Sequence, residues 1–244
     1  DVCSSDLFRK MTLQEVTVIG TYCYTNKDFE TSSFIQPSKY VSILDIGCGT
    51  GDVVNALTNY GHRAVGIEAS DSMVSKASQK YPDSKFYKGN ALNINLYKKN
   101  LFTHIICNNF FIYFIQSKKQ LFSNIYTWLK PGGYMIIHLI HPNNIHDILP
   151  NKHKKLHFDG FSYSSDLQAP MLDNDLSDIK TYIFKEKFKN TLNNKLKINE
   201  RTIYVEPIEH IVQKAQKVGF QKRGVANMRS EEHTSELQSP DHLV

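Results

Sequence analysis

Residues 43–52, ILDIGCGTGD, bring three glycines and two carboxylates together in one short stretch. An apolar run carrying Asp45 comes first, and Gly47, Gly49 and Gly51 then alternate with small residues before a second acid. Glycines at this spacing let the backbone approach a ligand closely, because no Cβ atom stands in the way. A carboxylate beside such a loop suits a ligand with a cationic group or with hydroxyl donors. The stretch therefore predicts a binding loop for a small ligand.

Two kinds of phosphate-binding loop can be compared with this stretch. A Walker-type loop ends in Gly-Lys followed by Ser or Thr, and the sequence contains no such triplet. A dinucleotide fingerprint has the spacing G-x-G-x-x-G, whereas Asp52 stands here at the position of the third glycine. An acid at this helix N-terminus repels a pyrophosphate, although it suits the helix dipole. The loop is therefore predicted to bind a ligand that is neutral or cationic at this point.

Strand and helix patterns alternate five times around this loop. Three amphipathic helices are expected, at 52–60, at 71–81 and at 116–130, the last of them ending at the PGG of 131–133. Such alternation predicts an α/β fold with a mainly parallel sheet and helices on both of its faces. The apolar runs that predict its strands lie at 41–46, 63–70, 85–92, 103–107 and 134–141.

The chain beyond residue 142 has a different character. Residues 142–178 are polar and rich in turn residues, so a long loop or lid is expected there. Apolar residues at 181–189 and 195–207 flank the turn-prone NTLNN and predict an antiparallel hairpin. A helix at 208–220 and a strand at 221–228 are expected to follow.

Both ends of the chain resemble translated sequencing adapters, the head at 1–7 and the tail at 229–244. Excluding them leaves 8–228 as the native domain, and predicts an incomplete, metagenomic fragment. Without Arg229 and the six acidic residues of the two ends, 28 basic and 18 acidic residues remain, so the net charge changes from +5 to +10. Only four of these basic residues are arginine, whose fork suits phosphate better than lysine does. The charge is therefore weak support for a nucleic-acid partner.

Composition narrows the class of protein further. Apolar stretches such as FFIYFI at 110–115 are far shorter than the about 20 residues of a spanning helix, so no membrane partner is expected. Four scattered cysteines without a C-x-x-C pair predict neither a disulfide framework nor a zinc site. A reducing, cytoplasmic compartment fits this usage. His138 and His141 fall on opposite faces of one strand, and the other histidines lack a ligand spacing, so no metal is expected.

The glycine loop and its surroundings resemble the class I S-adenosylmethionine-dependent methyltransferases of the small-molecule type. Their first motif is an acid-bearing strand followed by G-x-G-x-G, which 43–52 matches throughout. The resemblance covers about residues 40–141, and includes Glu68, the GNA of 89–91 and the LKPGG of 129–133. It implies a Rossmann-like, doubly wound sheet of the seven-stranded type with a C-terminal antiparallel hairpin. It also implies S-adenosyl-L-methionine as cofactor and methyl transfer by in-line displacement.

The resemblance further implies roles for individual residues. Asp45 is expected to attract the ammonium group of the cofactor, and Glu68 to hold its two ribose hydroxyls. Met73 is expected to pack on the adenine, whose edge the turn at Asn90 and Ala91 would read. Asn90 departs from the commoner acid of the family, so weaker or altered adenine binding is expected. The whole set expected at the cofactor is Asp45, Gly47, Cys48, Gly49, Gly51, Glu68, Ala69, Met73, Asn90, Ala91 and Asn108.

Acceptor groups in this family lie beyond strands four and five, which makes His141, Tyr113 and Asn109 the catalytic candidates here. The NNFF of 108–111 lacks the Pro-Pro of base-amine methyltransferases, and no Pro-Cys loop supports methylation of a cytosine carbon. A small-molecule acceptor is therefore expected, with residues 142–206 as its lid and hairpin.

Three other hypotheses remain at this point. The first is an RNA methyltransferase with a basic surface, and the second is a nicotinamide oxidoreductase that tolerates Asp52. The third is a non-catalytic subunit that has the cofactor-binding fold and binds a protein partner. Neither the methyl acceptor nor the oligomeric state follows from the sequence.

Overall fold

The computed structural model describes residues 16–20, 41–143, 145, 156–158, 161–168 and 179–227. The two adapter-like ends, 1–7 and 229–244, lie outside the described residues, as does most of the expected loop or lid at 142–178.

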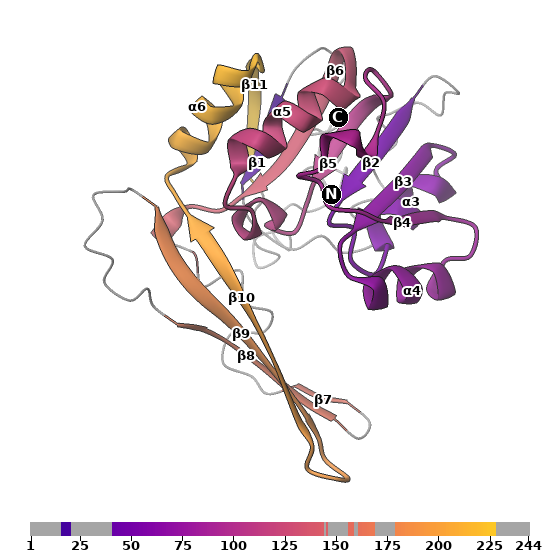
Figure 1. Ribbon diagram of the computed structural model, residues 1–244, viewed down its shortest axis with the longest axis vertical. Coiled ribbons are helices and arrows are strands. Elements are labelled where there is room, and N and C mark those ends of the chain that lie inside the picture. The colour runs from indigo at the N-terminus through magenta and orange to yellow at the C-terminus, as the bar shows by residue number, and fades with distance from the viewer. Residues whose placement is uncertain are drawn as a thin grey trace, which may run out of the picture.

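A seven-stranded sheet forms the centre of the molecule (Figure 1). Every neighbouring pair in it is parallel, in the order β11-β1-β6-β5-β2-β3-β4. The expected doubly wound, mostly parallel sheet of the seven-stranded type is confirmed. Its strands are β1 (Val16–Gly20), β2 (Ser42–Ile46), β3 (Arg63–Glu68), β4 (Lys85–Lys88), β5 (Phe102–Cys107), β6 (Leu129–Leu139) and β11 (Lys222–Asn227).

Helices cover both faces of this sheet, because the side chains of each strand alternate between them. Ile43 belongs to one core cluster, together with residues of α3 (Asp52–Asn59) and α4 (Asp71–Lys80). Its neighbour Leu44 belongs to the other cluster, which contains residues of α5 (Lys118–Trp128) and α6 (Ile208–Val218). Two cores, one on each face, therefore hold the parallel strands in place.

Strand β6 begins earlier than its sequence predicts. The helix expected at 116–130 ends at Trp128, and β6 then runs through the LKPGG stretch, where the sequence analysis had no strand. Leu129 pairs with Phe102, and the register then shifts so that Tyr134 pairs with His104. The intervening residues form an irregularity in which Gly132 has φ +73°. Pro and Gly were interpreted as a break, but here they shape a bulge.

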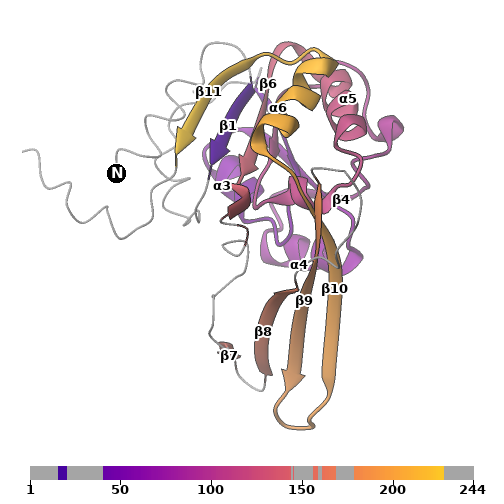
Figure 2. The ribbon, with the colours of Figure 1, turned by 90° about the vertical axis from the view of Figure 1, so that its left-hand side faces the viewer.

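A second, antiparallel sheet has the order β10-β9-β8-β7. It is made of β7 (Leu156–Phe158), β8 (Phe161–Gln168), β9 (Lys180–Asn190) and β10 (Leu196–Val205). The predicted hairpin is confirmed as β9 and β10, which we call the arm (residues 180–205). Figures 1 and 2 show the arm projecting away from the parallel sheet. The prediction of a loop at 142–178 is wrong for β7 and β8, because β8 pairs along β9.

A buried ion pair fastens the base of the arm to the helices. Glu206 follows β10 directly, and its carboxylate lies 3.3 Å from Lys118 Nζ of α5. Both side chains are 1 % exposed. Lys214 of α6 pairs with the other carboxylate oxygen, and Lys118 also donates to the backbone oxygens of Ile115 and Tyr204, each at 3.0 Å. The end of the arm is thus held by groups from two helices at once.

Candidate functional site

The glycine loop leads from the end of β2 into α3. Gly47, Gly49 and Gly51 all have left-handed backbone conformations, with φ of +71°, +55° and +86°. Side-chain-bearing residues adopt this region at a cost, which explains the alternation of glycine in the sequence. The N–H groups of Gly47 and Cys48 both donate to the carbonyl oxygen of Ile67, at 2.8 and 3.1 Å. The loop is therefore tied to β3, the next strand of the sheet.

The three glycines differ in what surrounds them. A Cβ atom on Gly47 would lie 2.3 Å from the ring of Phe111, and one on Gly51 would lie 2.4 Å from the ring of Phe86. A Cβ atom on Gly49 would meet nothing within 4 Å. Gly47 and Gly51 thus allow close internal packing, whereas Gly49 borders open space. That space is where the loop can meet a ligand.

Glu68 brings a carboxylate to this loop from the end of β3. Its Oε2 accepts from the N–H of Gly49 at 3.3 Å, and its Oε1 accepts from the N–H of Ser70 at 3.0 Å. The side chain is half-buried. Because β2 and β3 are parallel neighbours, their carboxyl ends meet at one edge of the sheet. The separation of about 20 residues in sequence therefore becomes direct contact in space.

Asp45 places a second carboxylate close to the first. It is only 2 % exposed, and burial together with the nearby charge of Glu68 raises its pKa to about 8. Among the described residues it has no basic partner that would lower the pKa again. A buried carboxylate beside another carboxylate favours the approach of a cationic group. The edge of the sheet at β2 and β3 is thus suited to a ligand with positive charge and hydroxyl donors.

Asp52 has a different environment. Its carboxylate accepts from the hydroxyl groups of Thr50 and Tyr81 and from Lys80 Nζ, each at 2.6 Å. Burial alone would raise its pKa, but these three hydrogen bonds outweigh burial and lower it. Asp52 therefore joins α3 to the end of α4, and both of its carboxylate oxygens already accept hydrogen bonds within the protein.

The expected adenine-side residues lie on α4 and on the turn after β4. Ala69 is exposed, and Met73 is half-buried in the first turn of α4. Asn90 is exposed, and its Oδ1 accepts from the N–H of Leu92 at 3.0 Å. Ala91 is buried, and its carbonyl oxygen accepts from Asn124 Nδ2 at 2.8 Å. The amide oxygen of Asn90 thus shapes the turn, and its amide nitrogen remains available for a ligand.

The segment after β5 packs directly on the glycine loop. Asn108 is buried, whereas Asn109 is exposed, and Asn109 and Phe110 have φ of +47° and +58°. Two consecutive non-glycine residues in this region store strain, a common feature of functional loops. This turn of the backbone places Phe111 against Gly47. It also places Phe110 against His138, with ring centroids 4.0 Å apart. This segment forms the wall between the glycine loop and the fifth strand.

The two remaining catalytic candidates lie in opposite environments. Tyr113 is fully buried, and its hydroxyl both donates to the carbonyl oxygen and accepts from the N–H of Ile140. Burial raises its pKa well above the usual range. His141 is exposed after β6, and its Nδ1 accepts from the N–H of Asn143 at 3.3 Å. His141 can therefore reach a substrate, whereas the hydroxyl of Tyr113 is taken up within the core.

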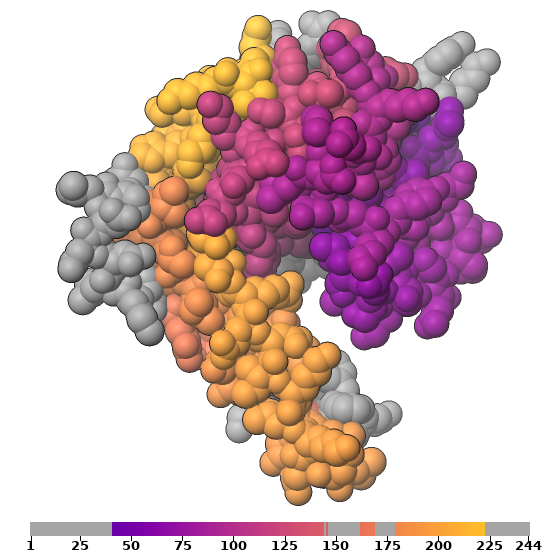
Figure 3. Space-filling view, viewed as in Figure 1, coloured from indigo at the N-terminus to yellow at the C-terminus, as the bar shows by residue number. Residues whose placement is uncertain are grey.

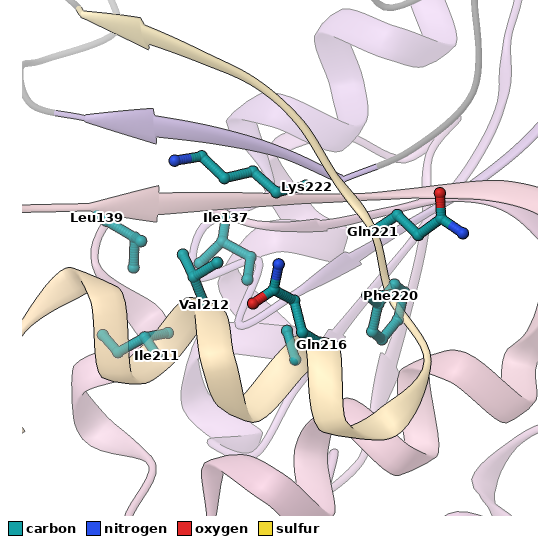
Figure 4. A pocket seen from close by; sticks show the side chains of 9 residues that line it. Ile137, Leu139, Ile211, Val212, Gln216, Phe220, Gln221 and Lys222 are labelled. Atoms are coloured by element: carbon teal, nitrogen blue, oxygen red, sulfur yellow. The ribbon is translucent and has the colours of Figure 1, made fainter.

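The described cysteines and histidines offer neither a reactive thiol nor a metal site. Burial raises the pKa of the Cys48 thiol to about 12, and that of Cys107 lies higher still. Within the part of the chain that the structure describes, no three His, Cys, Asp or Glu side chains could hold a metal ion. The pocket in Figure 4 lies between α6 and β6, and none of its lining residues belongs to the glycine loop. In Figure 3 the surface instead recedes between the arm and the segment that carries α4.

Comparison with known proteins agrees with this geometry. A protein-family model described as "Methyltransferase domain" matches residues 44–137. A putative methyltransferase of Invertebrate iridescent virus 6 is 26% identical over 206 residues, which cover 78% of this chain and 74% of that protein. A solved S-adenosylmethionine-dependent methyltransferase from Clostridium acetobutylicum superposes with a TM-score of 0.61 at 19% identity, over 81% and 80% of the two chains. The chain therefore carries a methyltransferase domain. The resemblance drawn from the glycine loop is confirmed.

Further matches cover smaller parts of longer proteins. Phosphoethanolamine N-methyltransferase 1 of Zea mays is 31% identical over 118 residues, which are 46% of this chain and 23% of that protein. The chain thus matches less than a quarter of the plant enzyme. The structure of DesVI from Streptomyces venezuelae shares the fold, with a TM-score of 0.57, at 14% identity over 76% and 78% of the two chains.

The structure brings some of the residues that the sequence indicated together. Asp45, Gly49 and Glu68 meet at one edge of the sheet, whereas Tyr113 is enclosed behind it. Sequence reasoning missed Phe86 and Phe111, whose rings occupy the space beside Gly51 and Gly47. Phe86 belongs to no motif, and the NNFF of 108–111 does not reveal the contact of Phe111 with Gly47, because both contacts arise from long-range packing. No helix in the described part of the chain is long and apolar enough to span a membrane.

Proposed function

We propose that this methyltransferase binds S-adenosyl-L-methionine at the carboxyl ends of β2 and β3 and transfers its methyl group to a small molecule. The observation that carries the proposal is the pair of carboxylates at the glycine loop, Asp45 and Glu68, which has no basic partner among the described residues. A ligand with an ammonium group, a sulfonium and a ribose diol supplies what this pair lacks.

The residues present fit such a ligand. Asp45 would pair with the ammonium group, since a cation beside it relieves the cost of ionising a buried carboxylate. Glu68 would turn its oxygens from the backbone N–H groups to the ribose hydroxyls, a bidentate arrangement. Gly49 would lie beneath the ligand, with Met73 beside the adenine. Cys48, Gly47, Gly51, Ala69, Asn90, Ala91 and Asn108 complete the proposed set.

The chain itself contributes positioning to the reaction. When bound, the cofactor supplies an electrophilic methyl group on a sulfonium, and in-line displacement requires the acceptor atom on the opposite side of that methyl. Asn109 and His141, both exposed beyond β5 and β6, would orient the acceptor. Nδ1 of His141 accepts from Asn143, which leaves its Nε2 atom available to an acceptor molecule. Tyr113 would act only by supporting the Ile140 backbone that precedes His141.

Small amines are the acceptors to test first. Two of the similar proteins are a phosphoethanolamine N-methyltransferase and a dTDP-amino-sugar N,N-dimethyltransferase of Streptomyces venezuelae. An ammonium acceptor must lose a proton before its nitrogen can attack, which an exposed site next to solvent permits. Release of S-adenosylhomocysteine during incubation with phosphoethanolamine, aminosugar nucleotides and single-stranded RNA would separate the small-molecule proposal from RNA methylation.

Calorimetry with S-adenosylmethionine and S-adenosylhomocysteine tests the cofactor site directly. The full chain should bind both, and Glu68→Gln should bind them about 10- to 100-fold more weakly, because it loses a charged hydrogen-bond acceptor. Lys98→Gln, an exposed change away from the loop, serves as the matched control. Absence of binding by a chain whose circular dichroism shows it to be folded would refute the proposal.

A further inference from the structure

The arm carries an unbalanced positive charge. Residues 180–205 contain seven basic and two acidic side chains, a net charge of +5. Both acids are already paired, Glu186 with Arg201 at 2.7 Å and Glu200 with Lys185 at 2.5 Å. The other five lysines of the arm have no acidic partner among the described residues. The described residues therefore leave the charge of the arm unbalanced.

The strand register sorts these side chains onto two faces. Phe184 and Phe188 lie on one face, together with Tyr163 of β8, and Phe184 also contacts the ring of Phe114 next to the parallel core. The opposite face is formed by alternate residues, in which Lys187 stands across from Ile198 and Lys189 across from Leu196. Side chains of directly opposed residues lie on the same side of an antiparallel pair. We call this second set, with Leu192 of the turn, the lysine face.

Aliphatic side chains on the lysine face are open to solvent. Leu192 is 86% exposed, Leu196 is 56% exposed and Ile198 is 45% exposed. Lys187 and Lys189 beside them are exposed as well. Figures 1 and 2 show the outer half of the arm clear of the parallel sheet, so the core does not cover this face. A group of exposed aliphatic residues next to uncompensated cations marks an interaction surface.

The chemistry of the lysine face matches an anionic lipid surface. Lysines near such a surface are attracted by acidic headgroups, and aliphatic side chains gain by entering the interfacial region between them. A protein surface for nucleic acid would be expected to offer arginine forks or aromatic rings for stacking. The outer residues of the lysine face, namely Lys187, Lys189, Leu192, Leu196 and Ile198, include neither. Lysine and aliphatic residues together therefore favour lipid over RNA.

We propose that the arm docks on an anionic lipid bilayer through Lys187, Lys189, Leu192, Leu196 and Ile198. The contact is peripheral and needs no spanning helix. The sequence predicts no membrane partner only because it lacks an apolar stretch long enough to span a bilayer. The face becomes visible only when the pairing of β9 with β10 is known, because in sequence its residues alternate with those of the inner face. The inference does not depend on the proposed methyl transfer.

Sedimentation of the full chain with phosphatidylcholine vesicles, with and without phosphatidylserine, tests the proposal. The protein should sediment only with the anionic vesicles, and less so as salt is added, because the attraction is screened. The double variant Lys187→Gln/Lys189→Gln should lower the partition coefficient about 25-fold, at about fivefold for each lysine. Leu192→Ser/Leu196→Ser should also weaken binding while leaving the charge unchanged.

A matched control distinguishes the lysine face from general positive charge. Lys98→Gln/Lys99→Gln removes the same charge from two exposed residues outside the arm and should leave binding within about twofold. Equal losses in the two double variants would overturn the proposal, as would failure of the unaltered protein to bind anionic vesicles. Self-association through the lysine face, or tighter binding to single-stranded RNA than to vesicles, would overturn it as well.

Discussion

The two carboxylates at the glycine loop differ in burial, and this difference can be used to separate their roles. Asp45 is almost wholly enclosed, whereas Glu68 is half-buried and reaches the loop through Gly49. If Asp45 meets the ammonium group and Glu68 the ribose, a ligand that lacks the amino-acid part should depend on Glu68 alone. Methylthioadenosine is such a ligand.

We therefore predict opposite patterns for two isosteric substitutions. Asp45→Asn should weaken S-adenosylhomocysteine binding about 10-fold or more and leave methylthioadenosine binding within about twofold, because only the first ligand has an ammonium group. Glu68→Gln should weaken both ligands. Titration calorimetry with the two ligands measures the difference. Equal losses for both ligands in Asp45→Asn would contradict the assignment of Asp45 to the ammonium group.

At the scale of elements, the glycine loop offers a direct comparison between packing and ligand space. Gly47 and Gly49 share the left-handed conformation, but only a Cβ atom on Gly47 would collide with a neighbour, the ring of Phe111. Gly49→Ala should cost about 1–2 kcal/mol of unfolding free energy from backbone strain alone, and should remove cofactor binding. Gly47→Ala should be clearly more destabilising, because Phe111 must move as well.

Urea denaturation of the two glycine variants, paired with cofactor calorimetry, measures both effects. The decisive result is a Gly49→Ala variant that folds but does not bind the cofactor. If Gly49→Ala bound the cofactor normally, the open space beside Gly49 would not be the ligand site.

The ion pair at the base of the arm predicts a second effect at this scale. Glu206→Ala leaves Lys118 buried next to Lys214 without its counter-charge, which should cost about 3–5 kcal/mol. The double variant Lys118→Met/Glu206→Leu should be much less destabilising, because it leaves no fully buried charge; the Lys214 side chain is 32% exposed and can be solvated. Denaturant titrations of Lys118→Met, Glu206→Leu and the double variant form a double-mutant cycle. Additive losses would show that the two residues act independently.

Most elements of the core could be predicted from sequence, because each carries its own signal, but β1 (Val16–Gly20) was not among them. Gly51 precedes α3 where the apolar period changes, and Asp45 and Glu68 lie at or next to the ends of strands that lead into turns. Lys118 and Glu206 could not be predicted, because they meet across 88 positions of sequence and neither belongs to a motif. Tyr113 was chosen for its place after the fourth strand, but its burial depends on how α5 and β6 pack around it. Local patterns thus predict most strands and the glycine loop. The Lys118–Glu206 ion pair and the burial of Tyr113 depend on long-range packing instead.

For the whole molecule, buried titratable groups on different elements predict how stability changes with pH. Burial lowers the pKa of His138 and of His104 to about 4, helped at His104 by the charge of His62, and burial raises that of Asp45 to about 8. The two histidines stay neutral in the folded protein while the unfolded chain takes up protons below pH 6.5, so stability falls as the pH drops from 6.5 to 4. Asp45 stays protonated in the folded protein, whereas the unfolded chain loses this proton above pH 3.8. The contribution of Asp45 to the free energy of unfolding therefore falls as the pH rises from 3.8 to 8.

These opposing changes should place the maximum of stability at about pH 6.5, because two histidines outweigh one aspartate below that value. His138→Gln should make the acid side less steep by about 1.4 kcal/mol per pH unit and leave the alkaline side unchanged, since it removes one of the protons taken up on unfolding. Asp45→Asn should do the reverse and flatten the alkaline side up to pH 8. Urea titrations across this pH range measure both slopes. A curve for His138→Gln that is parallel to that of the unaltered protein on the acid side would show that this histidine is already charged in the folded state.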